Sequence, residues 1–322
     1  MNRLHPVRPA ADAVPRPTAP RQHRSVASGP WHRATRKLAP YLLLLPFFLT
    51  FVVFLLYPLV LSLILVFHQT WGPTERVYVG LDNLRFLWTQ PLFWKSMWNT
   101  VIYAASAVLI QVPLSLGLAM LLNREDIRGR AWFRLIFFSP SLVGLVFVAI
   151  LAWIMFAQRT GVINQLLARV TFGAWDIDFP WLNEFAMPAV ILASLWMYVG
   201  FNMVYFLAAL QNVSSDVREA ALVDGAGPWH RFLHVTVPAI KPIATFVILL
   251  SLIGSFQLFE LPFILFGGGG PNDQVLTPVI YLYQSGFEGS NDLGLASAIG
   301  WTLALILFTF ALGQKLLGRE RH

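Results

Sequence analysis

The sequence predicts an all-α polytopic membrane protein with six transmembrane helices. Of its 322 residues, 57% are hydrophobic and only 12% are charged, which is about half the charged fraction of an ordinary soluble domain. The apolar residues gather in six runs, each long enough to cross a hydrocarbon core roughly 30 Å thick. These runs lie near residues 39–67, 98–122, 133–156, 187–210, 243–266 and 292–316.

The basic residues predict the orientation of these spans. Eighteen of the 23 Lys and Arg residues lie in the N-terminal tail, around 124–134, in the loop 211–242 and at the C-terminus. Lys and Arg accumulate on the cytoplasmic side of membrane proteins, so we expect both termini and the loop 211–242 in the cytoplasm. The net charge of +7 is therefore a topology signal first, and we expect no nucleic-acid partner.

Two parts of the chain differ in composition. Residues 1–37 are rich in Arg, Pro and Ala and are predicted to be a disordered basic cytoplasmic tail. Its charge serves topology, with binding to the membrane surface as the alternative. Residues 38–318 form the predicted transmembrane permease domain, in which prolines inside the spans produce kinks. The chain has no cysteine, which excludes disulfides and thiolate catalysis.

The three predicted external loops differ in kind. Residues 68–97 are rich in aromatic side chains, as expected of a helix lying at the membrane interface. Residues 157–186 carry Trp175 and Trp181 among acids, and residues 267–291 begin with four glycines and hold no Lys or Arg. Aromatic belts at the membrane surface explain such compositions. A docking surface for an extracytoplasmic partner explains them equally well.

The cytoplasmic loop 211–242 carries helix signals. Asp216 is suited to cap a helix, and Glu219 stands three residues later, as in a capping box. Ala220 and Ala221 are strong helix formers. Gly225 stands where a C-terminal cap needs a positive φ. The first half of the loop is therefore predicted to be a short capped helix closed by a glycine turn.

The second half of this loop predicts another short helix. Pro228 is suited to its first position, the helix extends to about His234, and Pro238 and Pro242 end the unit before the fifth span. A connector of this length is not needed to join adjacent helices. It is either a capped connector or a rigid element that a partner grips and that transmits motion as a body.

The motifs of this loop resemble the cytoplasmic signature loop of binding-protein-dependent ABC importer permeases. The pattern is Glu219-Ala220-Ala221, then Gly225, then Val235-Thr236-Val237-Pro238, where the family usually has larger aliphatic residues at the two valines. The resemblance covers roughly residues 38–318. It is closest to the carbohydrate-uptake branch and to its six-span type, which includes the maltose permease F and glycerol-phosphate permease A subunits. Further matching segments are Tyr57-Pro58, 79–83, 128–134, 200–203, Leu210-Gln211, 267–271 and 292–294.

This resemblance implies the type I ABC importer permease fold, in the cytoplasmic (inner) membrane of a bacterium or archaeon. It implies a permease subunit that moves a sugar or related carbohydrate by alternating access. The chain has no Gly-x-x-x-x-Gly-Lys-Ser/Thr motif, so it is no enzyme and binds no cofactor, and ATP–Mg belongs to a separate ABC ATPase dimer. Further implied partners are a second homologous permease, an extracytoplasmic solute-binding protein and membrane lipid. The residues that the resemblance assigns to ATPase coupling are Glu219, Ala220, Ala221, Asp224, Gly225 and Pro238.

The resemblance also places the substrate path on the fourth and fifth spans. Sugars need polar hydrogen-bond partners and aromatic faces. These side chains serve equally well as polar contacts between helices. Glu260 is the only acid expected deep in a span, and the lack of Lys or Arg in both spans disfavours a phosphorylated substrate. The candidate residues are Ser194, Trp196, Tyr198, Phe201, Asn202, Ser251, Ser255, Gln257 and Glu260.

Two other classes of protein fit the sequence less well. A secondary transporter or channel for a small polar solute usually needs several ionisable groups inside the membrane, whereas only Glu260 lies in a span and all seven histidines lie outside the spans or at their ends. An intramembrane enzyme is disfavoured because the sequence has no His-Glu-x-x-His and no Gly-x-Ser-x-Gly motif. No catalytic or metal-binding residue is predicted.

Overall fold

The computed structural model describes residues 30–72, 74–289 and 291–319, and most of these are helical. The chain divides into two compact units, residues 1–57 and 58–322. In the first unit, helix α1 (Pro30–Phe51) begins with proline at its first position and continues into a π-helical turn, Val52–Leu56. Residues 1–29 of the tail predicted for residues 1–37 lie outside the described residues. The remainder of that range, from Pro30, already belongs to α1.

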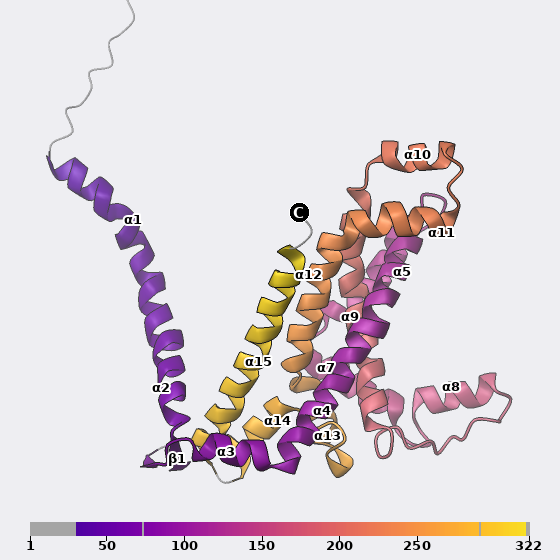
Figure 1. The fold of residues 1–322 in the computed structure, drawn as a ribbon. Helices are drawn as coiled ribbons and strands as arrows, with labels where there is room; N and C mark the ends of the chain where they lie inside the picture. Colours follow the sequence, from indigo (N-terminus) through magenta and orange to yellow (C-terminus); the bar gives the residue numbers. More distant parts are fainter. Residues whose placement is uncertain (1–29, 73, 290, 320–322) are drawn as a thin grey trace, which may run out of the picture. The chain divides into compact units, whose positions relative to one another are not determined.

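Among the described residues, five helices are long and apolar enough to cross a membrane, and a bent pair of helices forms a sixth span if it is counted as one. One of these helices is Tyr41–Leu65, which includes α2 (Tyr57–Leu65). The others include α4 (Pro91–Ser106) with α5 (Val112–Asn123), α9 (Ala186–Gln211), α12 (Val237–Phe256) and α15 (Leu293–Arg319). Figure 1 shows α5, α9, α12 and α15 running along the second unit.

The third predicted span, residues 133–156, is bent sharply at one of the prolines for which a kink was predicted. It is a pair, α6 (Arg130–Phe138) with the 3₁₀ turn Ser139–Leu142 and then α7 (Leu145–Phe156), bent by 102°. Proline within the 3₁₀ turn and the extended backbone of Gly144 interrupt the helix. Hydropathy alone does not distinguish such a bend from a straight span.

Prolines in the long helices are accommodated by wide turns. Three of the four π-helical turns in the described part of the chain end two residues before a proline, namely Pro58, Pro113 and Pro238. A proline ring clashes with the carbonyl four residues before it in a regular helix, and a wider turn changes the position of that carbonyl. The helices therefore continue through these prolines.

The fifth predicted span, residues 243–266, also differs from the structure. Its helix starts at α11 (Pro228–Arg231), passes through the π turn Phe232–Thr236 and continues as α12 without a break. The expectation that Pro238 and Pro242 end the loop unit was wrong, because both prolines lie inside this continuous helix. The helix stops at Phe256 and resumes as α13 (Glu260–Phe266), so the predicted span is interrupted inside the membrane-spanning stretch.

The first external segment contains strands that the sequence did not predict. Strands β1 (His68–Trp71) and β2 (Glu75–Tyr78) form an antiparallel hairpin in which His68 pairs with Tyr78. Helix α3 (Asp82–Thr89) follows the hairpin. The Asn83 side-chain amide donates to the carbonyl oxygens of Val66 and His68, at 2.9 Å each, and so fixes α3 to the hairpin.

The segment 267–291 is packed into the protein rather than a free external loop. It contains the 3₁₀ turn Pro271–Asp273, helix α14 (Pro278–Tyr283) and the π turn Gln284–Glu288. The Asn99 amide donates to the carbonyl oxygens of Asp273 and Leu276 at 2.8 and 3.0 Å. Leu276 and Ile280 are fully buried, so much of this segment belongs to the core.

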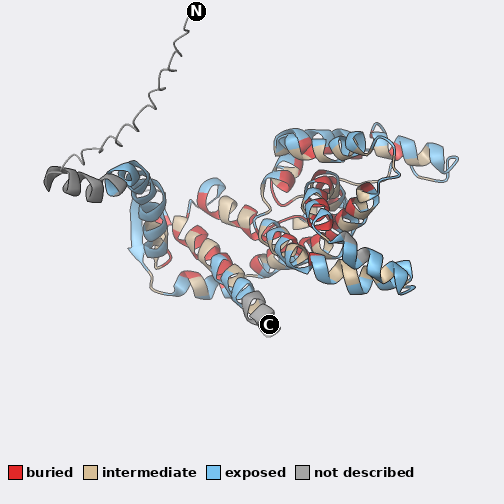
Figure 2. Ribbon diagram, turned by 90° about the horizontal axis from the view of Figure 1, so that it is seen from above, coloured by how far each residue is buried: buried red, intermediate tan, exposed pale blue. Residues whose placement is uncertain are grey.

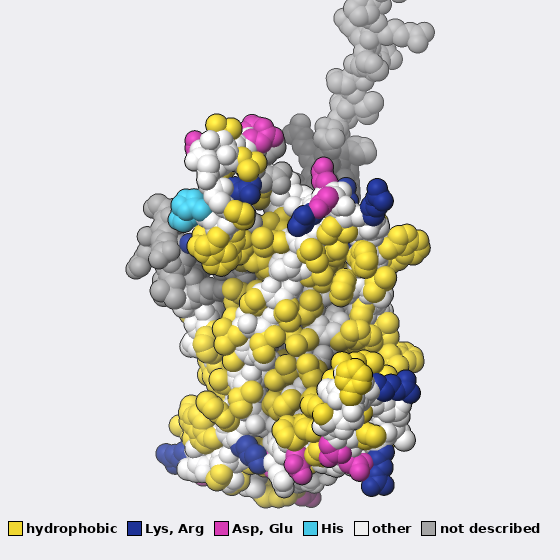
Figure 3. Space-filling view, turned by 90° about the vertical axis from the view of Figure 1, so that its right-hand side faces the viewer, with side chains coloured by type: hydrophobic (Ala, Val, Ile, Leu, Met, Phe, Trp, Pro, Cys, Tyr) yellow, Lys and Arg dark blue, Asp and Glu magenta, His cyan; other side chains and the backbone are white. Residues whose placement is uncertain are grey.

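Buried residues gather between the helices of the second unit (Figure 2). Apolar side chains also cover its outside. Three buried clusters lie between α7, α9 and α13, between α4, α14 and α15, and between α5, α9 and α12. On the face in Figure 3, apolar side chains form a broad band, and Lys, Arg, Asp and Glu lie toward its two ends. This distribution is the one expected for helices in a bilayer.

Candidate functional site

A cavity of about 290 Å³ lies in the second unit where two long helices depart from regular α-helical geometry. One departure is the π turn Ala107–Gln111 between α4 and α5, and the other is the break between α12 and α13. Residues of both, together with α7 and α9, line the space that we call the central cavity. Such irregular turns place side chains and backbone groups where a regular helix does not, and they often occur at functional sites.

Seven of the nine side chains predicted for the substrate path line this cavity. Ser194 is buried next to it and accepts a hydrogen bond of 2.8 Å from the Tyr103 hydroxyl. Trp196 does not line the cavity, and its side chain is 45% exposed on another side of α9. The seven lining residues are Tyr198, Phe201, Asn202, Ser251, Ser255, Gln257 and Glu260.

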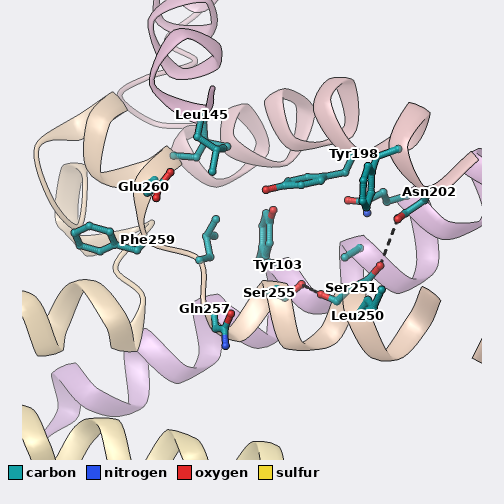
Figure 4. A pocket seen from close by; sticks show the side chains of 16 residues that line it. Tyr103, Leu145, Tyr198, Asn202, Leu250, Ser251, Ser255, Gln257, Phe259 and Glu260 are labelled. Carbon is teal, nitrogen blue, oxygen red and sulfur yellow. Dashed lines mark hydrogen bonds between the residues drawn. The ribbon is translucent and has the colours of Figure 1, made fainter. Parts of the chain in front are cut away.

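Three of the polar groups are already used between helices or within them. Asn202 donates to the Ser251 hydroxyl across α9 and α12 at 3.4 Å, and the Ser255 hydroxyl donates to the Ser251 carbonyl at 2.7 Å. Figure 4 shows these two contacts as dashed lines. Among the described residues, Tyr198, Gln257 and Glu260 make no side-chain hydrogen bond. Of the seven predicted residues, these three therefore keep side-chain hydrogen-bonding capacity for a ligand.

The walls of the cavity are aromatic as well as polar. Tyr103 and Tyr198 extend into the same space from α4 and α9 (Figure 4). Phe201 lies on the same side of α9, and Phe259 lies in the break before α13. Flat aromatic faces beside hydrogen-bonding groups suit the alternating apolar and hydroxyl surfaces of a sugar ring.

The charge of the cavity comes from one carboxylate. Glu260 is the first residue of α13 and is exposed to the cavity instead of being enclosed in the bundle. No Lys, Arg or His is among the lining residues. An anionic ligand would therefore meet a like charge without a compensating cation.

Sequence reasoning missed the contribution of the second and third spans. Tyr103, Ala107 and Gln111 line the cavity from α4 and the π turn, and Leu145 does so from the start of α7. The spacing was a usable signal, because Tyr103 and Gln111, both able to form hydrogen bonds, are separated by two intervals of four residues and so lie along one helix face with Ala107 between them.

The loop 211–242 forms the second functional region, residues 214–236, which we call the α10–α11 unit. Its first helix is α10 (Ser215–Val223). The predicted cap was wrong by two residues: Ser214 is the N-cap, and its hydroxyl accepts from the Asp216 backbone N–H at 3.2 Å. Asp216 lies inside the helix, so Glu219 does not complete a capping box with it. Ser, like Asp, is a strong N-cap residue, and the sequence alone did not decide between them.

The end of α10 agrees with the predicted glycine turn. Gly225 has φ +72°, its N–H donates to the Leu222 carbonyl at 3.1 Å, and the Ala226 N–H donates to the Ala221 carbonyl at 3.0 Å. These two bonds form a Schellman motif, which requires a left-handed residue at this position. Pro228 is the first residue of α11, as predicted.

The predicted coupling residues lie at the surface of the α10–α11 unit and the adjoining helix. Glu219, Ala220, Asp224, Gly225 and Pro238 are exposed, and Ala221 is half-buried. Apolar side chains beside them are also exposed, with Val223 88% and Leu222 53% accessible. Figure 1 shows α10 beyond the ends of α5 and α9. The described residues therefore leave these apolar side chains of the α10–α11 unit uncovered.

These features define an integral membrane protein of several apolar helices, with a polar cavity among them and a projecting helical unit at one end. The family model of the binding-protein-dependent transport system inner membrane component matches residues 111–321. The chain belongs to this family, and it is a multi-pass protein of the cytoplasmic membrane.

Relatives in this family share most of the chain. The arabinooligosaccharides transport system permease protein AraP of Halalkalibacterium halodurans is 37% identical over 88% of this chain and 88% of its own length. The lactose transport system permease protein LacF of Rhizobium radiobacter is 35% identical over 84% of this chain and 90% of its own length. These relatives are permease subunits, not enzymes, and the chain is a permease subunit of the same kind.

A solved structure has the same fold. It is a bacterial ABC transporter involved in the import of the acidic polysaccharide alginate, with a TM-score of 0.77 and 23% identity over 90% of this chain and 98% of that one. The type I importer permease fold predicted from the resemblance is thereby confirmed.

Proposed function

We propose that this chain is the permease subunit of an ATP-driven importer that moves a neutral carbohydrate by alternating access. A separate ATPase dimer supplies the energy through the α10–α11 unit. The observation that carries this proposal is the unbroken helix from Pro228 to Phe256. At 1.5 Å per residue it spans about 43 Å, and it joins the exposed unit at one end to Ser251 and Ser255 in the cavity wall at the other.

A rigid connection of this kind is what coupling requires. The α10–α11 unit is fixed by its own backbone hydrogen bonds at the Gly225 turn, so force on α10 moves the unit as a body. The long helix transmits that motion to the break at Gln257–Phe259, where the backbone is no longer helical. A displacement there changes the access to the cavity from one side of the membrane relative to the access from the other side.

In this proposal the coupling residues have different roles. Glu219, Ala220, Ala221 and Asp224 present the face that the ATPase grips, and Gly225 sets the turn behind that face. Pro238 follows the π turn that joins the unit to the spanning helix. This chain binds no nucleotide of its own, and ATP–Mg stays on the ATPase dimer.

The substrate class follows from the chemistry of the central cavity. Aromatic faces and neutral polar groups suit a sugar, and a carboxylate without any lining Lys or Arg disfavours an anionic one. The names of two relatives, an arabinooligosaccharide permease and a lactose permease, support a neutral mono- or oligosaccharide. Tyr198, Gln257 and Glu260 are its proposed hydrogen-bonding partners in this subunit.

The proposed complex has further members. A second, homologous permease completes the translocation path, with both termini of this chain in the cytoplasm. An extracytoplasmic solute-binding protein delivers the carbohydrate. The alginate transporter has been solved in complex with an alginate pentasaccharide-bound periplasmic protein, which supports a partner of this type.

Two glycines offer a matched test of the coupling role. An added Cβ meets nothing within 4 Å at either Gly225 or Gly227, but Gly225 has φ +72° and Gly227 has φ −63°. Alanine at a left-handed position costs about 1–2 kcal/mol, equivalent to roughly 5–30-fold in an equilibrium. We therefore expect Gly225→Ala to weaken capture of the co-expressed ATPase subunit, and Gly227→Ala to leave it unchanged.

Glu219→Ala completes this experiment because the exposed carboxylate is replaced without backbone strain. We expect weaker capture of the ATPase with normal membrane insertion. If neither Glu219→Ala nor Gly225→Ala changed capture, the docking assignment would be wrong. Uptake of a labelled sugar into vesicles that contain no ATPase subunit would instead favour a secondary transporter or channel.

A further inference from the structure

Helix α8 (Val162–Val170) and the residues after it fold onto the end of α7. The Asn164 side chain is fully buried, and its oxygen accepts from the indole N–H groups of Trp175 and Trp181 at 3.3 and 2.8 Å. Its amide donates to the Phe179 carbonyl at 3.1 Å. One face of α8 is therefore fixed by a closed set of hydrogen bonds and packed aromatic rings.

The opposite face of α8 is apolar and uncovered by the described residues. Val162, Leu166 and Val170 recur every four residues, which places them on one face of the helix. They are 53%, 58% and 67% exposed, and Phe172, just beyond the helix, is 98% exposed. Phe172 has φ +53°, a left-handed conformation that bulky residues rarely adopt. We call Val162, Leu166, Val170 and Phe172 the α8 apolar face.

The depth of this face follows from its attachment to α7. Only five residues separate Phe156, the last residue of α7, from Val162. The Gly161 N–H donates to the Ala157 carbonyl at 3.0 Å, and a Cβ on Gly161 would lie 2.2 Å from that oxygen. The connection is thus a tight turn, so α8 begins at the end of the apolar helix that precedes it.

Apolar side chains are also exposed at the end of α7 from which the chain leads to α8. Trp153 and Ile154 in the last turn of α7 are 55% and 47% exposed, and Trp is enriched where a span leaves the hydrocarbon core. Helix α8 carries no acidic residue, and Arg169 in its last turn is exposed. An Arg side chain beside an apolar face reaches the phosphates of lipid headgroups while the apolar groups insert below them.

We propose that α8 lies on the membrane, with its apolar face and Phe172 inserted into the leaflet where α7 ends. The occupant of this face is lipid, and Arg169 meets the headgroups. The hydrogen bonds of Asn164 hold the helix at this depth. An anchor of this kind fixes the end of α7, and Leu145 at the other end of α7 lines the central cavity. The proposal concerns membrane contact and stands apart from the transported substrate.

Because the sequence contains no cysteine, a single introduced cysteine is the only position that a thiol-specific label can modify. A nitroxide on Leu166→Cys is measured in vesicles of phosphatidylethanolamine and phosphatidylglycerol that contain the assembled transporter. Collision rates with oxygen, which partitions into lipid, and with a water-soluble nickel chelate report the surroundings of the label. We expect a high oxygen-to-nickel ratio at this position, corresponding to a depth of about 5–10 Å. Glu184→Cys, an exposed position in the same external segment, is the matched control and should give a low ratio.

Each other result overturns the proposal in a defined way. A nickel-accessible label at Leu166→Cys means that the face is in water. A label shielded from both reagents means that a protein, such as a second permease, covers it. Immobilisation of the label only when a purified solute-binding protein is added means that the face docks that protein. Phe172→Cys is the second position to measure, because a side chain that is 98% exposed can be replaced without disturbing the packing.

Discussion

The α10–α11 unit and the central cavity are built in opposite ways. The unit is shaped by bonds between neighbours in the sequence: the Ser214 cap, the Gly225 turn and Pro228 at the start of α11. The cavity depends on groups far apart in the sequence, such as Tyr103 with Ser194 and Asn202 with Ser251. Substitutions in the unit should therefore alter association with a partner, whereas substitutions around the cavity should alter stability as well as transport.

The largest expected effect is at Gly200, next to the cavity-lining Phe201. A Cβ there would lie 1.7 Å from the Phe137 backbone oxygen, so Gly200→Ala forces α9 away from α6. Overpacking of this kind costs about 3 kcal/mol, and we expect a large loss of thermal stability in detergent. Gly117→Ala on α5 is the control, since nothing lies within 4 Å of its Cβ. Equal unfolding temperatures for the two variants would contradict close packing at Gly200.

The next effect concerns the charge of the cavity. Glu260→Gln should preserve uptake of a neutral sugar, because its side-chain oxygen still accepts hydrogen bonds. Glu260→Lys should shift the preference toward an anionic glycoside by roughly tenfold, or about 1.4 kcal/mol. The measurement is competition between neutral and anionic sugars in transport-competent vesicles. An unchanged preference in Glu260→Lys would remove Glu260 from the substrate path.

A smaller effect is expected where two cavity helices are joined. Tyr103→Phe removes the donor to Ser194 at 2.8 Å, which should cost about 1 kcal/mol. Because both variants break the same bond, the double variant Tyr103→Phe/Ser194→Ala should lose less stability than the sum of the single ones. Additive losses in detergent unfolding would show that this hydrogen bond does not couple α4 to α9.

The smallest effect is expected at an exposed ion pair. Arg124 and Asp126 lie 2.6 Å apart in the connection between α5 and α6, and the hydrogen bond from Arg124 lowers the pKa of Asp126. Any stabilisation is then complete above the ordinary carboxyl pKa and fades as the pH falls through the lowered value. Both side chains are solvated, so Asp126→Asn should leave unfolding at pH 7 unchanged. A clear loss at that pH would show a structural role that exposure does not suggest.

The same contrast, between contacts local in the sequence and contacts between distant segments, explains which features of each region were predicted from the sequence. Gly225 and Pro228 have positions dictated by backbone geometry over a few residues, and both were predicted. The choice of Ser214 over Asp216 as the cap was not, because either side chain satisfies the same local rule.

The missed parts depend on contacts between distant segments. Tyr103 and Leu145 enter the cavity only because α4 and α7 pack beside α9 and α13, and hydropathy contains no information on that packing. Leu276 likewise lies in a segment fixed by the Asn99 amide, 177 residues away, which donates to the Leu276 carbonyl oxygen. The bend between α6 and α7 had a local signal in Pro140 and Gly144, but prolines elsewhere in the chain lie in helices that continue.

The π turn Ala107–Gln111 also determines how this cavity could be reshaped over evolution. A π turn is equivalent to one extra residue in an otherwise regular helix. Deleting one residue from it would restore regular geometry and rotate everything beyond it by about 100° about the helix axis. The whole stripe of α5 that faces α9 would then face elsewhere. At this point of the chain a change of length, more than a change of side chain, is the step that would exchange one cavity lining for another.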